Sequence, residues 1–167
     1  MRIVALLPVF ALLAVAGCST APPDTTAADT EAINRLRSDY IAAVNAEDAA
    51  KVAALFTEDG MRMESNMPAV KGRDAIQKGL AEQFAPFDVD ISITSEELVI
   101  AGDWAFDRGQ YMSHLMPKDP QQQMLMEQGK YIVILRRQAD GSWRLAREIG
   151  NSNVPLPPPA TPAPAGK

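Results

Sequence analysis

The first half of the chain carries apolar residues at the spacing of amphipathic helices. In the segment TEAINRLRSDYIAAVNAED, the apolar side chains fall on one face, and Asp29 or Thr30 precedes them as a cap. That face consists of Ile33, Leu36, Tyr40, Ile41 and Val44. The pattern predicts a first helix that packs one side against a core.

Two more helices are predicted after it. The segment EDAAKVAALFTEDG starts a helix at Asp48 that should end at Gly60, and a short strand over 61–64 should follow. The segment GRDAIQKGLAEQFA predicts the third helix. The inward faces of these two helices are Val52, Leu55 and Phe56, and Ile76, Leu80 and Phe84.

After Pro86 the hydrophobic period changes from that of a helix to two, which is typical of strands. The stretch FDVDISITSEELVIAG alternates through Val89, Ile91 and Ile93, and Gly102-Asp103 predicts a turn. Three more strands are predicted in WAFDRGQYMSHLM, MLMEQGKYIVILRRQ and SWRLAREIGNS, joined by the polar loop PKDPQQQ and the tight turn ADG. Helices followed by an antiparallel sheet indicate the α+β class.

The N-terminal segment has the pattern of an export signal. Arg2 is followed by an apolar run over 3–16, too short for a comfortable membrane span, so 1–17 is interpreted as a signal peptide. The end of the run, VAGC, resembles a bacterial lipobox, which implies cleavage before Cys18 and a lipid on that residue. Cys18 is the only cysteine, so no intramolecular disulfide is possible. The alternative is a plain signal peptide with an incidental cysteine.

These features predict a protein bound to the bacterial cell envelope through lipid on Cys18. Ser19 follows the cysteine, and by resemblance to enteric sorting rules it favours the outer membrane, facing the periplasm. Residues 18–29 read as a flexible tether, 30–153 as the domain and 154–167 as a proline-rich disordered tail. A docking peptide in polyproline conformation is the alternative for the tail.

Composition and motifs exclude several classes of function. The 167 residues carry a formal net charge of −5 without a basic stripe, so a nucleic-acid partner is not expected. The domain has no phosphate-binding loop, no zinc pattern, no Gly-x-Ser-x-Gly and no nucleophilic cysteine. We therefore expect no cofactor, no metal and no covalent catalysis.

Four sequence segments, taken in their order along the chain, resemble the SnoaL-like families of the nuclear transport factor 2-like superfamily, above all the ketosteroid-isomerase-like domains. The segments are DYIAAVNAEDAAKVAALFTEDGMRME, GRDAI, GDWAFDRGQY and GKYIVILRRQADGSWRLAREIGNS. The resemblance implies three N-terminal helices packed on a curved antiparallel sheet that forms a conical pocket. It also implies a small-molecule ligand and, in many members, dimerisation through the sheet.

The same resemblance suggests site residues. It aligns Tyr40 with a catalytic tyrosine and Glu64 with a catalytic base, both chemically suited to moving a proton or holding an oxyanion. The position of the third catalytic acid falls on Val133, which cannot donate a hydrogen bond. Isomerase chemistry of that type is therefore in question.

Strand register adds further candidates. A turn at 139–142 pairs Val133 with Glu148, and pairing across the PKDPQQQ loop brings Asp107 beside Val133. Glu64, Asp107 and Glu148 are then the candidate acid–base residues together with Tyr40. Candidate ligand-binding residues are Tyr111, Tyr131, Val133 and Arg144, and Arg144 could instead neutralise one of the acids. Three functions stay open: binding of a small, largely apolar molecule, acid–base catalysis (an isomerase, dehydratase or cyclase), and a non-catalytic envelope module.

The opposite sheet face is expected to be apolar, with Trp104, Phe106, Ile132, Ile134, Trp143, Leu145 and Ile149. It predicts a homodimer through the outer sheet face, or else a register reversed by one residue. The same face carries Met112, His114, Met116, Met124 and Met126 towards one end. Thioether and imidazole groups suit Cu(I), but methionine is also a common filler of apolar surfaces, and packing is the expectation.

Overall fold

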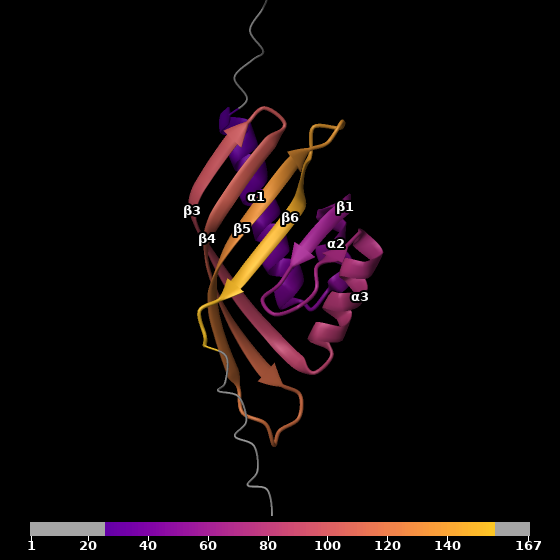
Figure 1. Cartoon of the computed structure of the whole chain (residues 1–167), viewed down its shortest axis with the longest axis vertical. Coiled ribbons are helices and arrows are strands. Elements are labelled where there is room, and N and C mark those ends of the chain that lie inside the picture. The colour runs from indigo at the N-terminus through magenta and orange to yellow at the C-terminus, as the bar shows by residue number, and fades with distance from the viewer. Residues whose placement is uncertain (1–25, 156–167) are drawn as a thin grey trace, which may run out of the picture.

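The computed structural model describes residues 26–155 of the chain (Figure 1). The predicted signal peptide, Cys18, the first part of the tether and the tail from 156 onward lie outside these residues. Within them, no helix is both long and apolar enough to cross a bilayer.

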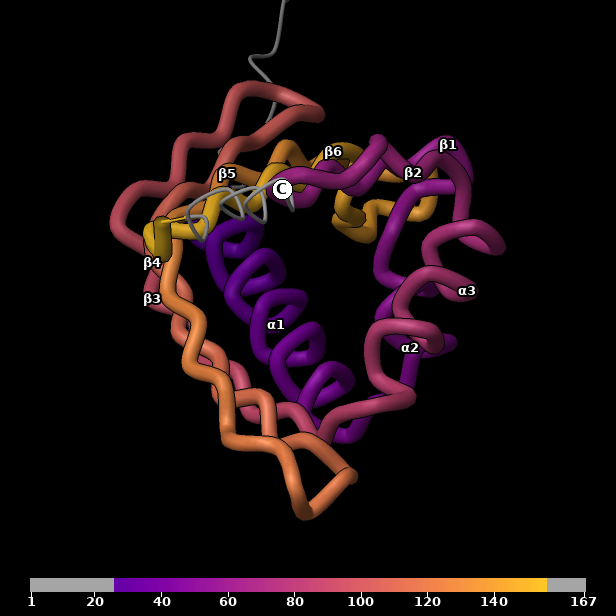
Figure 2. Tube along the Cα trace, turned by 60° about the horizontal axis from the view of Figure 1, so that its bottom comes forward, coloured from indigo at the N-terminus to yellow at the C-terminus, as the bar shows by residue number. Residues whose placement is uncertain are grey.

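The described residues form three helices and six strands. In chain order these are α1 (Thr26–Asn45), α2 (Ala49–Ala54), β1 (Phe56–Met63), β2 (Val70–Lys71), α3 (Arg73–Phe84), β3 (Phe87–Ala101), β4 (Trp104–Pro117), β5 (Leu125–Arg137) and β6 (Trp143–Ser152). The strands make one sheet in the order β2-β1-β6-β5-β4-β3. The α+β class is confirmed. The sheet curves around α1, and α2 and α3 lie on the side of α1 away from β3 and β4 (Figure 2).

Helix α1 begins at Thr26, earlier than the predicted cap at Asp29 or Thr30, so the last residues of the predicted tether are helical. Asp29 lies in the first turn and is 5 % exposed. Arg137 of β5 donates two hydrogen bonds to its carboxylate, at 2.5 and 2.6 Å, and the Trp143 indole N–H donates a third at 3.1 Å. These contacts fix the start of α1 to the β5–β6 hairpin.

Helix α2 is shorter than predicted. Asp48 caps it by accepting a hydrogen bond from the Lys51 N–H, but the helix ends at Ala54 instead of Gly60. Phe56, fully buried, starts β1 and lies beside Leu145 of β6. The Ala-rich sequence favours a helix here, but pairing with β6 prevails, because it buries Phe56 and provides backbone hydrogen bonds.

The sheet is mixed, which corrects the purely antiparallel prediction. Strand β1 runs parallel to β6, while the other neighbours are antiparallel. The two-residue strand β2 pairs with β1 and was not predicted, since two residues give no periodic signal. Helix α3 matches its prediction and buries Ile76, Leu80 and Phe84.

The register of the long strands follows the prediction up to one bulge. Val133 pairs with Glu148 and with Asp107, as expected. Between Ile134 and Leu135 the register shifts, so that Leu135 pairs with Leu145. The shift places Leu145 on the concave side, and Trp143 and Leu145 are buried in the core, so their assignment to the outer face was wrong.

Candidate functional site

A cavity of about 120 Å³ lies between α1 and the concave side of the sheet. Its apolar wall comes from α1, β3, β5 and β6, through Ile33, Leu36, Ile91, Ile93, Val133, Leu135 and Leu145. All but one of the predicted catalytic and ligand-binding residues also line it: Tyr40, Glu64, Asp107, Tyr111, Tyr131, Val133 and Glu148. The predicted strand register thus places these side chains on one face.

The cavity contains a linked acid cluster, consisting of Tyr40, Arg62, Glu64 and Glu148. The Tyr40 hydroxyl donates a hydrogen bond to Glu148 Oε1 at 2.7 Å. Arg62 lies between the two acids, with Nη2 2.9 Å from Glu64 Oε1 and Nε 3.6 Å from Glu148 Oε2. The register of the parallel strands β1 and β6 pairs Arg62 with Glu148, so the two residues are direct neighbours in the sheet.

The two acids of this cluster differ in environment. The Glu148 side chain is 12 % exposed and that of Glu64 is 28 % exposed. Within residues 26–155, Glu148 Oε2 has no hydrogen-bond partner, and neither has Arg62 Nε. Burial raises the pKa of Glu148, and the nearby charge of Glu64 adds to the rise, while Arg62 and the Tyr40 hydrogen bond oppose it. Burial, followed by the Glu148 charge, also raises the pKa of Tyr40 well above its usual value.

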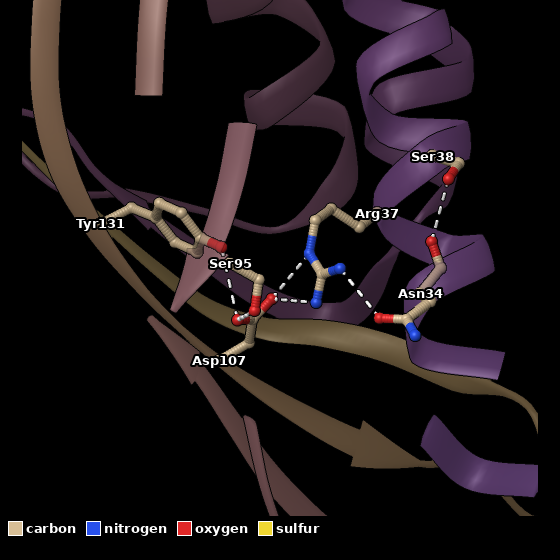
Figure 3. Close-up of polar contacts among 6 residues, drawn as sticks. All are labelled: Asn34, Arg37, Ser38, Ser95, Asp107 and Tyr131. Atoms are coloured by element: carbon tan, nitrogen blue, oxygen red, sulfur yellow. Dashed lines mark hydrogen bonds and ion pairs between the residues drawn. The ribbon is translucent and has the colours of Figure 1, made fainter. Parts of the chain in front are cut away.

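A second polar cluster surrounds Asp107, which is 2 % exposed (Figure 3). Arg37 of α1 donates to Asp107 Oδ2 through Nε at 2.9 Å and Nη2 at 2.6 Å. Oδ1 accepts from the Ser95 hydroxyl at 2.5 Å and from the Tyr131 hydroxyl at 3.3 Å. Asn34 holds Arg37 in place by accepting from Nη1 at 2.9 Å.

The Asp107 carboxylate is therefore saturated with hydrogen bonds and neutralised by Arg37. Such a group positions its neighbours and is poorly placed to exchange protons with a ligand. Burial and the Asp107 charge raise the pKa of Tyr131 to about 12, which keeps its phenol protonated near neutrality. The candidate acid–base role predicted for Asp107 is better assigned to Glu148 and Glu64 on this geometry.

A third pair lies towards the other end of the cavity. The Tyr111 hydroxyl contacts Glu127 Oε1 at 3.2 Å, and both residues line the cavity. The Tyr111 ring packs over Gly129, where an added Cβ would lie 2.5 Å from the ring. A glycine at this position is what allows the ring to lie flat against β5.

Arg144 is the predicted site residue that does not line the cavity. It pairs with Arg136 across the β5–β6 hairpin and donates from Nη1 to the Ala54 carbonyl. The bulge near Leu145 places Arg144 outside the cavity, so no contact seen here supports its predicted ligand-binding or neutralising role.

The arginines that neutralise the acids are Arg37 and Arg62, and the sequence prediction missed both, as it missed Glu127. Arg37 follows the buried Leu36 on α1 and lies one helical turn before Tyr40, a spacing that could have indicated a neighbour of the tyrosine. Arg62 precedes Glu64 by two residues on the same strand face, which could likewise have revealed it.

Metal ligation of the usual kind is not supported at this site. Among the residues that the structure describes, no three His, Cys, Asp or Glu side chains are placed to hold a metal ion together. The groups that line the cavity can instead donate, accept and exchange protons next to an apolar wall.

Helices packed on the concave side of a curved mixed sheet, with a mixed polar and apolar cavity between them, define the class of nuclear transport factor 2-like α+β domains. The family model described as the SnoaL-like domain matches residues 25–148, and the chain belongs to that family. None of the curated proteins matches the sequence.

Solved structures support the fold. A ketosteroid isomerase-like protein from Erwinia carotovora atroseptica is 27 % identical, with a TM-score of 0.69, and the match covers 75 % of this chain and 96 % of that one. A conserved protein from Planctomyces limnophilus is 22 % identical over 75 % of this chain and 98 % of its own, also with a TM-score of 0.69. A hexachlorocyclohexane dehydrochlorinase is 18 % identical over 81 % and 97 %, with a TM-score of 0.68. The last two likenesses concern the fold alone.

Proposed function

We propose that the cavity binds a small organic molecule with a largely apolar body and a polar group that contacts Glu148. The observation that carries this proposal is a buried carboxylate oxygen, Glu148 Oε2, without a hydrogen-bond partner among the described residues, in a cavity that also has a continuous aliphatic wall. Apolar walls with few convergent polar groups are typical of ligand sites. The volume of about 120 Å³ suits a body about the size of one six-membered ring, since a cavity of about 150 Å³ holds benzene.

Native mass spectrometry of protein purified gently from its source tests this proposal. The expected result is an adduct of defined mass that is lost on denaturation. A Val133→Phe variant, which fills the cavity, should lose the adduct, while Val99→Phe on the outer face should retain it. An adduct unaffected by Val133→Phe would contradict binding in the cavity, as would protein that never carries one.

The second candidate is a cofactor-independent acid–base enzyme that uses Glu64 and Glu148 with Tyr40. Two carboxylates in unlike environments, both within reach of Arg62, favour it, because a buried acid with a raised pKa beside a more exposed carboxylate can form a donor and acceptor pair. The more exposed Glu64 would accept a proton, and Glu148 with Tyr40 would donate to a developing oxyanion.

Glutamine variants separate the two candidates once the adduct is identified. In an enzyme, Glu64→Gln should bind the molecule as the wild type does and lose its conversion to product. If the wild-type protein leaves the molecule chemically unchanged over many hours, the binding function stands and the enzyme is excluded.

We also propose that the protein is anchored to the bacterial envelope by lipid on Cys18, in the outer membrane facing the periplasm. The support is the lipobox-like sequence that ends in the only cysteine, followed by Ser19. Mass spectrometry of the mature protein should show a diacylglyceryl cysteine at its N-terminus, and Cys18→Ser should release the protein from the membrane fraction. A soluble wild-type protein with an unmodified Cys18 would contradict the anchor.

A homodimer through the outer sheet face is the remaining proposal. Trp104, Ile132 and Val99 expose 47 %, 37 % and 41 % of their surface on neighbouring strands, and Phe106 pairs with Val99. Such a contiguous apolar face suits a second copy of the chain. Sedimentation of the wild type should give a dimer and Ile132→Lys a monomer, with Val154→Lys as the control; a wild type that is monomeric at micromolar concentration contradicts the proposal.

A further inference from the structure

The outer face of the sheet changes character along β4. Near Trp104 its exposed apolar residues are aromatic or aliphatic, and none of them is a methionine. In the middle lies a charged belt, consisting of Glu96, Glu97 and Arg108 with Gln110. Arg108 contacts both glutamates, at 2.9 and 2.6 Å, and Gln110 donates to Glu96 at 2.5 Å.

Beyond this belt, the exposed apolar residues of the outer face are methionines. Met112 and Met116 alternate with His114 on β4, and they face away from the cavity, since Ser113 between them is buried and lines it. The four methionines Met112, Met116, Met124 and Met126 expose 41 %, 48 %, 53 % and 55 % of their surface. The charged belt separates them from the apolar patch at Trp104, so they do not extend that patch.

The strand register brings the sulfur groups around the histidine. Met126 of β5 lies directly opposite His114. Met124 directly precedes β5, and Met116 follows Leu115, the β4 residue that pairs with Leu125 at the start of β5. Opposite side chains begin about 5 Å apart and next-but-one positions about 7 Å apart, so thioether and imidazole arms of this length can reach a shared point above the sheet.

A carboxylate flanks the histidine on the other side. Asp90 of β3 pairs with His114, and its Oδ2 lies 3.7 Å from Nδ1. A carboxylate beside Nδ1 favours a proton on that nitrogen and leaves Nε2 as the nitrogen that can bind a metal. A carboxylate that accepts a hydrogen bond from this nitrogen commonly orients a metal-binding histidine, and Asp90 is the carboxylate placed next to it here.

We propose that His114, Met126 and the neighbouring Met116 and Met124 form a surface site for a soft monovalent metal ion, Cu(I). Thioethers and a neutral imidazole are ligands that select Cu(I) over hard cations. The ligands carry no negative charge to offset that of the ion, and a monovalent ion costs less to desolvate than a divalent one, so neutral ligands favour the monovalent ion. The site lies on the face opposite the cavity and is independent of the cavity's function.

Anaerobic titration with Cu(I) against a chromophoric chelator tests the site. The full chain should carry Cys18→Ser, which removes the only thiol as a competing ligand. We expect one Cu(I) per chain in this parent, and loss of its competition with the chelator in His114→Ala and in Met126→Leu. Asp90→Asn should weaken binding by about tenfold, as loss of a partner that orients a ligand does.

Met67→Leu is the matched control, because Met67 is 65 % exposed but lies in the segment between β1 and β2. It should bind as the parent does. Methyl-labelled methionine with Ag(I), a soft diamagnetic ion, locates the site: the signals of Met116, Met124 and Met126 should shift, and that of Met67 should not. A parent that takes up no Cu(I), or a His114→Ala variant with unchanged affinity, overturns the proposal.

Discussion

The Tyr40 hydroxyl donates a 2.7 Å hydrogen bond to Glu148 across 108 residues of sequence, and so joins the first helix to the last strand inside the cavity. The bond stabilises the ionised form of Glu148, which opposes part of the effect of burial. Through this hydrogen bond, the stability of the fold depends on whether Glu148, the candidate catalytic group, is protonated.

Tyr40→Phe should raise the pKa of Glu148 further, because the hydrogen bond that favours its charged form is lost. The free energy of unfolding should fall by about 1–2 kcal/mol, the usual cost of removing one partner of a buried hydrogen bond. Carboxyl carbon NMR and urea unfolding measure the two effects. A pKa of Glu148 that falls in this variant would contradict the role assigned to the hydroxyl.

Glu148→Gln should change how stability depends on pH. With a raised pKa in the fold, Glu148 holds a proton that the unfolded chain has already released, so its contribution to stability is greatest below its ordinary pKa of 4.5. That contribution is lost as the pH rises from there through the raised pKa. Glutamine stays neutral and can still accept from Tyr40.

Urea unfolding of both proteins from pH 4 to pH 8 measures this difference. The variant should gain stability relative to the wild type as the pH rises. The free energy of unfolding of the variant minus that of the wild type should therefore be lowest at pH 4. A constant difference across the range would show that the pKa of Glu148 is not raised.

Arg37→Ala should destabilise the fold strongly, because it leaves the Asp107 carboxylate buried without its cation. The expected loss in the free energy of unfolding is about 3 kcal/mol, as for other broken buried pairs. The control is Arg35→Ala, whose salt bridge with Glu31 is 68 % and 74 % exposed and should contribute less than about 1 kcal/mol. Similar losses in the two variants would show that the Arg37–Asp107 pair is not specially important.

Asp29→Ala tests whether the start of α1 is fixed to the sheet. It removes the acceptor of both Arg137 hydrogen bonds and of the Trp143 indole N–H. We expect a loss of about 2–3 kcal/mol, since charged hydrogen bonds are stronger than neutral ones. Chemical unfolding and the near-ultraviolet dichroism of Trp143 report it, and an unchanged unfolding midpoint would mean that residues 26–29 are dispensable.

The sequence predicted most of the cavity face because short loops determine the strand register. The ADG turn and the PKDPQQQ loop leave one plausible pairing for Val133, and that pairing brings Asp107 and Glu148 to its side. The prediction for Phe56 failed because its parallel contact with β6 joins distant segments, and local propensity carries no information about it. The prediction for Leu145 failed because of the bulge between Ile134 and Leu135, which the alternating pattern does not reveal.

The spacing of Arg37 and Arg62 places them near the acids, but it does not show that they turn inward. Arg37 and Arg62 occupy positions next to apolar stripes, where a charged side chain usually points to solvent. Both turn inward and pair with a buried carboxylate from a distant segment, Arg37 with Asp107 and Arg62 with Glu148. Such ion pairs can be identified only once the tertiary structure is known.

Strand β6, the last of the described strands, lies in the interior of the sheet, between β1 and β5. During synthesis, β1 therefore lacks the neighbour that joins it to the rest of the sheet until the residues around Trp143 to Ser152 have emerged. Pairing between such distant segments makes folding slow compared with that of domains built from local contacts. A chain released early would carry all of the described helices and strands except β6 and would still lack the complete cavity.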